Sequence, residues 1–392
     1  MPLSTKSNSA FCTNPSGTFY ILPKKQDCIL TNAQLYIYFF YFIWYNVSTK
    51  KRGDKIMSAR ASNDYSISLV RFLATVAIII CHMLQYFDKE LMWWFNVGVQ
   101  IFLCISGYLY GRKGLIDDDF KFYKKNFSKI LLDYYIVTIP MFILLTIFVA
   151  DKFSIIALIK TLFTKTVMKG GEHLWYIPYC IICYFLTPLL SRYFERNKDK
   201  HIVLKFVLLG FIVTAIIEMF FQFFTAAWFL CYLLGYFLGH LSLKGKTRLY
   251  NTVCIIIVIF ALISNTLQII LDYVVKLELN DANDYYYARM CKYAHVALGT
   301  SIFLLCKKLF SAIFKNGYPK PLEIFCKCSD RYSYDIYLVH QFVILGPLSL
   351  MALTPMLPLN IVIIVAIILV SAVAVNIISR FLQKPLNKLL KI

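Results

Sequence analysis

The chain has 392 residues, of which 59% are hydrophobic, and a mean hydropathy of +0.64. A water-soluble protein of this length could not bury that much apolar surface, whereas a lipid bilayer accepts it, so the bilayer is the first expected partner. The net charge of +20 raises the alternative of nucleic-acid binding. Because the Lys and Arg residues gather in short links between apolar runs, with no nucleic-acid-binding motif around them, we expect no nucleic acid partner.

The first 57 residues differ from the rest of the chain. The apolar and aromatic stretch Gln34–Val47 is shorter than the ~20 residues that a spanning helix needs. It is not typical of a signal peptide, because basic residues follow it instead of a small-residue cleavage site. Met57 directly precedes the patterned part of the chain. We therefore expect residues 1–57 to be an N-terminal extension, poorly ordered or not native, with an interfacial anchor as the alternative, and residues 58–392 to be a transmembrane domain.

Apolar runs of spanning length repeat from Ser66 onward. None shows the alternating pattern of a membrane β-barrel, so helices are the expected spanning structure. The predicted fold class is therefore all-α, a polytopic membrane protein with about ten transmembrane helices. The predicted spans are 66–87, 92–111, 128–150, 174–191, 202–219, 222–243, 252–272, 292–314, 333–352 and 359–380.

The distribution of basic residues predicts the orientation of these spans. If the residues before the first span lie inside, most of the 41 Lys and Arg fall on inside links, and few fall on outside links. The positive-inside rule then favours an N-in, C-in topology, with which an even number of helices agrees. The two longest outside links, around 151–173 and 273–291, are expected to form an extracytoplasmic vestibule.

The 12 cysteines do not predict a metal site. Most lie inside apolar runs, where cysteine behaves as a small hydrophobic residue. Cys180 and Cys183 form a CxxC pair, and Cys326 and Cys328 form a CxC pair. Because no second pair stands at zinc-ligand spacing and no His-rich partner is present, we expect no metal.

The first predicted span carries two ionisable residues, Arg71 and His82. Such groups are costly inside a membrane, so each is a candidate for function. Their separation of eleven residues places them within roughly 20° of one helix face and about 16 Å apart along the axis. The guanidinium fork of Arg71 suits a phosphate or pyrophosphate, and His82 suits a general base near neutral pH. The pair predicts transfer of an activated group from a cytoplasmic carrier to an outside acceptor. An Arg71 that snorkels to the interface and a His82 satisfied in the core are the alternatives.

Several stretches in order resemble the membrane-bound acyltransferase-3 family, which contains many bacterial polysaccharide O-acetyltransferases. Tyr65–His82 matches the family's Arg-x10-His signature, and Val97–Lys113 matches its glycine–apolar–SGY pattern. His173–Leu190 matches its HLWY pattern. The resemblance covers residues 65 to about 380. The matching stretches are Tyr65–His82, Val97–Lys113, His173–Leu190, Cys231–Gly239 and Ser333–His340.

The resemblance implies a ten-helix acyltransferase in the inner (cytoplasmic) membrane. It would take an acyl group, usually acetyl, from acetyl-CoA as co-substrate, with no permanently bound cofactor. The acceptor would be a hydroxyl of a surface polysaccharide or other glycan. By position, His82 would be the catalytic base and Arg71 would serve the acyl donor. The donor and substrate cavity would contain Ser106, Gly107, Tyr108, Lys129, His173, Trp175, Tyr334, Tyr337 and His340.

Some of these assignments leave alternatives open. Ser106 and Gly107 could serve helix packing, and Trp175 could be an interfacial anchor. The family commonly carries an Arg-x-x-Arg and a Pro before its third helix, where this chain has NFSK, ending at Lys129, and Leu132. Lys129 can supply only a point charge there. A glycan or lipid-linked sugar transporter or flippase is the alternative function, but the repeated halves or broken helices expected of one are not visible.

Overall fold

A computed structural model describes residues 11–13, 19–21, 65–148, 154–163, 168–196, 201–220, 225–277 and 281–390. A short antiparallel pair of strands, β1 (Phe11–Thr13) and β2 (Phe19–Ile21), lies near the N-terminus. The rest of the predicted extension at residues 1–57 lies outside the described residues. From residue 65 onward, the described elements are all helical.

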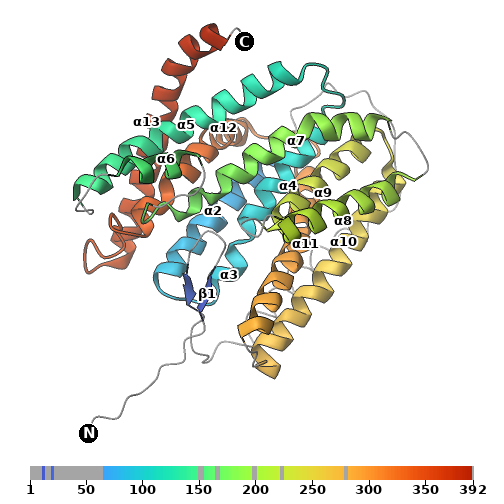
Figure 1. The fold of residues 1–392 in the computed structure, drawn as a ribbon, viewed down its shortest axis with the longest axis horizontal. Coiled ribbons are helices and arrows are strands. Elements are labelled where there is room, and N and C mark those ends of the chain that lie inside the picture. Colours follow the sequence, from blue (N-terminus) through green and yellow to red (C-terminus); the bar gives the residue numbers. More distant parts are fainter. Residues whose placement is uncertain are drawn as a thin grey trace.

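The helices form one bundle, with α2 and α4 in the middle, α10 and α11 on one side, and α5, α6 and α13 on the other (Figure 1). In chain order they are α2 (Ser66–Tyr86), α3 (Met92–Phe95), α4 (Val97–Gly111), α5 (Asp119–Phe148), α6 (Ile155–Phe163), η1 (Glu172–Trp175), α7 (Tyr176–Arg196), α8 (Ile202–Phe220), α9 (Ala226–Leu243), α10 (Thr247–Ile269), η2 (Ile270–Val275), α11 (Asp281–Ile313), α12 (Lys320–Ile344) and α13 (Leu357–Leu390).

The predicted fold class, an all-α polytopic membrane protein, is confirmed. Within the described ranges, nine helices are long and apolar enough to cross a membrane, from Ser66–Tyr86 to Leu357–Leu390. Each overlaps one of the predicted spans. The N-in, C-in orientation stays a prediction.

The predicted span 333–352 has the wrong boundaries. The helix in this region, α12, begins at Lys320 and ends at Ile344, and turns follow it from Gly346, whose φ is +79°. Its first half is too polar to read as a membrane span. The polar side chains of this half, such as Lys327 and Arg331, are mostly exposed, whereas the half from Ser333 onward is mostly buried in the bundle.

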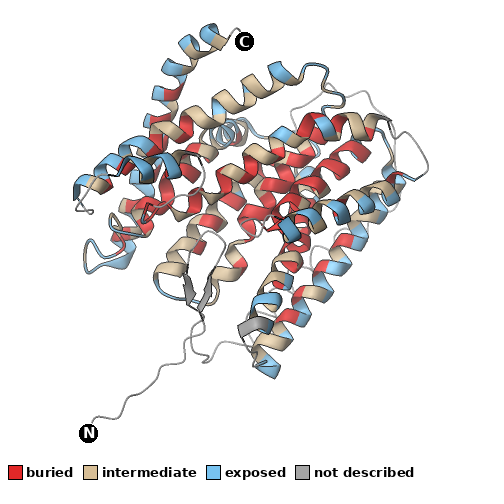
Figure 2. Ribbon diagram, in the orientation of Figure 1, coloured by how far each residue is buried: buried red, intermediate tan, exposed pale blue. Residues whose placement is uncertain are grey.

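Burial divides the helices into an inner and an outer set (Figure 2). The most apolar stretch of α9 is 78% buried, whereas that of α8 is 6% buried and that of α13 is 22% buried. The outer helices present large apolar side chains such as Phe211 and Val370 to the surroundings. A continuous apolar surface of this extent is stable against lipid and not against water.

Glycines bring the inner helices α4 and α9 into close contact. A Cβ atom added to Gly107 or Gly111 of α4 would overlap backbone atoms of α9, and one added to Gly235 or Gly239 would overlap backbone atoms of α4. These two small-xxx-small pairs face each other, which is the packing that lets membrane helices approach closely. Gly107, which the sequence placed in the cavity, therefore lies at a helix–helix contact.

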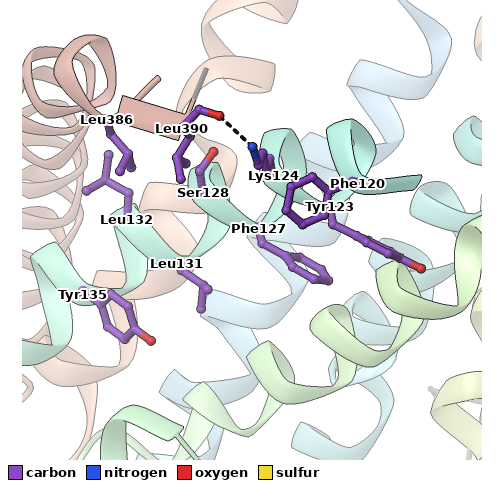
Figure 3. Close-up of a pocket in the computed structure, with 10 residues that line it drawn as sticks. All are labelled: Phe120, Tyr123, Lys124, Phe127, Ser128, Leu131, Leu132, Tyr135, Leu386 and Leu390. Atoms are coloured by element: carbon purple, nitrogen blue, oxygen red, sulfur yellow. Dashed lines mark hydrogen bonds between the residues drawn. The ribbon is translucent and has the colours of Figure 1, made fainter. Parts of the chain in front are cut away.

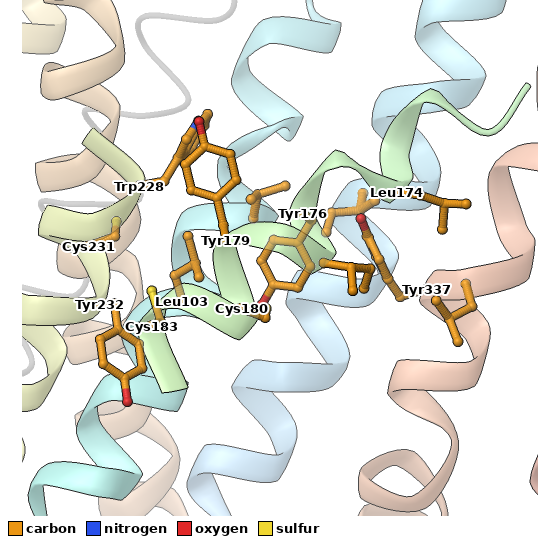
Figure 4. Packing of buried hydrophobic residues seen from close by; sticks show 14 of the residues in the cluster. Leu103, Leu174, Tyr176, Tyr179, Cys180, Cys183, Trp228, Cys231, Tyr232 and Tyr337 are labelled. Atoms are coloured by element: carbon orange, nitrogen blue, oxygen red, sulfur yellow. The ribbon is translucent and has the colours of Figure 1, made fainter. Parts of the chain in front are cut away.

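Aromatic and sulfur-containing side chains fill the space between α7, α9 and α12 (Figure 4). The Tyr176 ring lies 5.1 Å from that of Tyr337, and the Thr187 and Tyr232 hydroxyls are 2.6 Å apart. Rings packed edge to face add to the stabilisation from buried area. This cluster fixes the start of α7, and with it His173 on η1, against α12.

A hollow of about 540 Å³ lies between the beginning of α5 and the end of α13 (Figure 3). Apolar and aromatic side chains line it, and Lys124 Nζ donates to the Leu390 carbonyl at its edge, 2.9 Å away. None of the predicted site residues lines this hollow. The candidate chemistry lies elsewhere.

Candidate active site

Helices α2 and α12 run parallel and carry most of the candidate residues. Ring contacts follow the two helices in the same direction, with Tyr65 and Tyr318 at 5.3 Å and Phe72 and Phe325 at 4.8 Å between ring centroids. Further along, the His82 ring lies 5.1 Å from the His340 ring. The face of α2 that carries the candidate pair therefore meets α12.

Arg71 is paired with a carboxylate near the beginning of this contact. Its guanidinium forms an ion pair with Asp330 of α12, and the Ser68 hydroxyl donates to the same carboxylate at 2.6 Å. The Arg71 side chain is 20% exposed and that of Asp330 is 35% exposed, so the pair is partly open to its surroundings. A carboxylate at this position sets the direction of the guanidinium fork.

Three histidines from different elements meet at the other end of α2. His82 of α2, His173 of η1 and His340 of α12 have ring centroids between 5.0 and 6.5 Å apart. His173 is 4% exposed and His340 is fully buried. A cluster of this kind is unusual inside an apolar bundle, because each imidazole needs hydrogen-bond partners there.

Each histidine has a ring nitrogen within hydrogen-bonding distance of an oxygen. His82 Nδ1 lies 3.0 Å from Gln85 Oε1, one turn later on the same helix. His173 Nε2 lies 3.1 Å from the Leu338 carbonyl oxygen, and His340 Nδ1 lies 2.7 Å from the Tyr337 carbonyl oxygen. When Nδ1 of a neutral His82 donates to the Gln85 oxygen, Nε2 is the ring nitrogen that carries no proton.

A small cavity of about 50 Å³ opens beside His82. Side chains from α2, α3, the turn before α4, α4 itself, η1 and α12 line it. It has room for a few water molecules, so a substrate would have to displace lining side chains. The polar and aromatic residues of the lining are His82, Gln85, Trp93, Asn96, His173, Trp175 and Tyr337.

Comparison with protein-family models matches residues 64–379 to the acyltransferase domain of the acyltransferase-3 type. The match includes α2, the three histidines and the cavity. The chain belongs to the acyltransferase-3 family. Comparisons with curated proteins and with solved structures found no match. Membership supports a membrane acyltransferase, and the multiple apolar helices agree with it.

Several residues that the sequence assigned to the acyltransferase cavity do meet at the histidine cluster. Trp175 and Tyr337 line the cavity together with His82 and His173. The Tyr337 hydroxyl donates to the backbone carbonyl of His173, which ties η1 to α12. The Tyr334 hydroxyl instead donates to the carbonyl of Ile130 on α5, at 3.0 Å.

The SGY residues of the acyltransferase lie apart from this cavity. Gly107 packs against α9, and the Tyr108 ring lies 5.3 Å from that of Phe303 on α11. The Ser106 side chain interacts with the Tyr184 phenol. None of the three SGY residues lines the cavity beside His82.

Lys129 is exposed on α5 and interacts electrostatically with two buried carboxylates. These are Asp133, which accepts a hydrogen bond from Ser379, and Asp335, whose Oδ2 accepts one from Asn376 at 3.0 Å. Sequence reasoning missed both carboxylates, although an acidic residue inside an apolar run is itself a signal.

Other residues of the site carried weaker sequence signals. Gln85 follows His82 by three residues and so shares its helix face, a spacing that could have identified it. Trp93 and Asn96 lie inside the predicted span 92–111 and were not singled out, and Asp330 lies before the predicted start of its helix. Among the described residues, no group of three His, Cys, Asp or Glu side chains is arranged to hold a metal ion.

Proposed function

We propose that this acyltransferase moves an acyl group, most simply acetyl, from cytoplasmic acyl-CoA to a hydroxyl of a cell-surface glycan, within the inner membrane. The observation that carries the proposal is His82 itself. It lies in a cavity among apolar helices, and Gln85 holds its Nδ1 so that Nε2 is free to accept a proton.

The proposed reaction is direct transfer. Nε2 of His82 accepts the proton of the acceptor hydroxyl while the oxygen attacks the thioester carbonyl carbon. The new C–O bond forms, the C–S bond breaks, and the departing sulfur takes the proton from His82, giving the glycan ester and free CoA thiol. Holding both substrates at His82 would supply much of the acceleration.

The opposite end of α2 is the proposed donor side. Arg71 lies there, and α4 returns to the same end, where Lys113 follows its last turn. Burial and the nearby positive charge of Lys125 both lower the pKa of Lys113. A bound diphosphate would offset this repulsion, so the basic residues at this end support binding of the phosphates of CoA.

Mass analysis of the surface glycan tests the proposal. Cells would express the wild type, His82→Gln, Arg71→Lys or His201→Gln, at matched membrane levels. His201 is a control because it is exposed directly before the outer helix α8 and does not line the cavity. We expect acyl mass with the wild type and His201→Gln, and a loss of about 100-fold or more with His82→Gln.

Two results would contradict the proposal. Equal acylation in all four strains would remove His82 from the reaction. Loss of the glycan itself from the cell surface, instead of loss of its acyl groups, would favour a transporter or flippase of a glycan or lipid-linked sugar.

A further inference from the structure

The hydrogen bonds of the histidine cluster determine which ring nitrogens carry protons in the neutral state. A carbonyl or amide oxygen only accepts, so the nitrogen that faces it must donate. His82 therefore carries its proton on Nδ1, toward Gln85, and His173 carries its proton on Nε2, toward Leu338. The open nitrogens, Nε2 of His82 and Nδ1 of His173, are left as acceptors, and so is Nε2 of His340, whose Nδ1 faces the Tyr337 carbonyl oxygen. His340 does not line the cavity, so the acceptors of His82 and His173 are the two on rings that do.

The open nitrogen of His173 belongs to a buried ring that lines the cavity. His173 is 4% exposed, and its Nδ1 is buried without a hydrogen-bond partner in the structure. His173 and His82 line the same cavity, with their ring centroids 6.5 Å apart. The proposed reaction uses His82 and gives Nδ1 of His173 no task.

The His173 ring cannot easily turn away from the cavity. Its Nε2 is bound to the Leu338 carbonyl, and its backbone carbonyl accepts the Tyr337 hydroxyl. The rings of Tyr337 and Phe342 each lie 5.4 Å from it, edge to face. A buried acceptor that is held in place and lacks a partner is suited to bind a donor that arrives with the substrate.

Two neighbouring acceptors restrict the chemistry of what can bind. A carboxylate, phosphate or carbonyl oxygen has no hydrogen to donate, so its lone pairs would repel those of the two nitrogens. Two adjacent hydroxyls would instead donate one hydrogen bond to each nitrogen. We propose that the acceptor is a vicinal diol of a sugar. One hydroxyl donates to His82 and is acylated, and its neighbour donates to His173 and orients the ring. This inference rests on the proposed acyl transfer and specifies its acceptor.

Two substitutions at His173 separate the open nitrogen from the structural bond. His173→Asn places an amide oxygen near the position of Nδ1 and loses the reach to Leu338. His173→Gln reaches further, so its amide nitrogen can still donate to Leu338, but it puts no acceptor near Nδ1. If His173 has only a structural role, His173→Gln should keep more activity than His173→Asn. If Nδ1 binds a neighbouring hydroxyl, His173→Asn should keep more of the preference for an acceptor that carries this hydroxyl.

The experiment begins with the wild type. NMR spectroscopy of the surface glycan from expressing cells locates the acyl group. Membranes that contain the full chain then receive labelled acetyl-CoA and one of two synthetic acceptors. One is the oligosaccharide repeat of that glycan, and the other is the same oligosaccharide with the neighbouring hydroxyl replaced by hydrogen.

We expect the acyl group on a carbon whose neighbour carries a free hydroxyl. The wild type should use the deoxy acceptor with a kcat/KM at least about tenfold lower, because Nδ1 of His173 then stays unpaired. His173→Gln should treat the two acceptors within about threefold, and His173→Asn should keep most of the preference.

The inference is overturned if the wild type uses both acceptors equally, if the acyl group lies beside no free hydroxyl, or if His173→Gln keeps the full preference. These outcomes differ from failure of the proposed function, in which the wild type transfers no label from acetyl-CoA to either acceptor. Because the preference of the wild type is itself decisive, a variant that fails to accumulate does not remove the test.

Discussion

Arg71 of α2 is ion-paired with Asp330 of α12, and eleven residues further along α2 the His82 ring lies 5.1 Å from that of His340, ten residues further along α12. The two parallel helices thus hold both ends of the candidate site in one register. A substitution at one end of this helix pair should therefore affect the other end only if it shifts α2 relative to α12.

Asp330→Asn tests what the ion pair contributes. The pair is partly exposed, so its removal should lower the free energy of unfolding by no more than about 1 kcal/mol. If the carboxylate directs the guanidinium toward the donor, we expect KM for acetyl-CoA to rise several-fold with little change in kcat. Initial rates at varied acetyl-CoA, in membranes with matched protein levels, give both constants.

Glu323→Gln provides the control for Asp330. It also removes a carboxylate from α12, but the Glu323–Lys327 pair is exposed and 3.9 Å long. The KM of Glu323→Gln for acetyl-CoA should stay at the wild-type value. An unchanged KM in Asp330→Asn as well would leave the ion pair with a structural role only.

Gln85→Leu tests how His82 is oriented. The substitution keeps the size of the side chain and removes the oxygen that Nδ1 of His82 binds. The imidazole can then adopt the other tautomer or turn, so we expect kcat to fall about 10- to 100-fold. Gln85→Glu retains the acceptor and should keep most of the activity. Single-turnover rates with saturating substrates would separate this loss from weaker binding, and equal rates in Gln85→Leu and the wild type would exclude the orienting role.

His340 is expected to be a positioning residue for His82. It is fully buried, its ring is tilted by 42° against His82, and its Nε2 has no partner in the structure. His340→Ala would leave a cavity beside His82, so we expect kcat to fall about tenfold or more, with a loss of roughly 2 kcal/mol or more in stability.

His340→Phe distinguishes packing from chemistry at this position. Phenylalanine keeps a ring against His82 and removes both nitrogens, at some cost for its larger volume. If His340 acts by packing, the Phe variant should retain clearly more kcat than the Ala variant, at matched membrane levels. If both variants lose activity equally, an imidazole nitrogen of His340 takes part in the reaction.

The sequence was sufficient to predict the helical membrane fold and the placement of Arg71 and His82 on one helix, because apolar runs and the helical period are local properties. The family resemblance placed His173 and His340 in one cavity with His82, but these local properties could not, because that proximity depends on how η1 and α12 pack against α2. The boundaries of α12 were missed for a related reason. Hydropathy identifies apolar stretches, whereas α12 begins with an exposed polar half and is mostly buried only from Ser333 onward.

The contact between α4 and α9 gives a stability prediction that does not depend on the reaction. A Cβ atom on Gly235 would overlap the backbone of Cys104, and backbone atoms cannot move aside as a flexible side chain can. Gly235→Ala should therefore destabilise the protein by about 1–3 kcal/mol, seen as a lower unfolding temperature in detergent. Gly210→Ala on α8 is the matched control, since its new methyl group would meet only the Leu230 side chain at 3.5 Å. There the higher helix propensity of alanine should leave stability unchanged or slightly raised. Unfolding of Gly235→Ala at the wild-type temperature would contradict a close contact between α4 and α9.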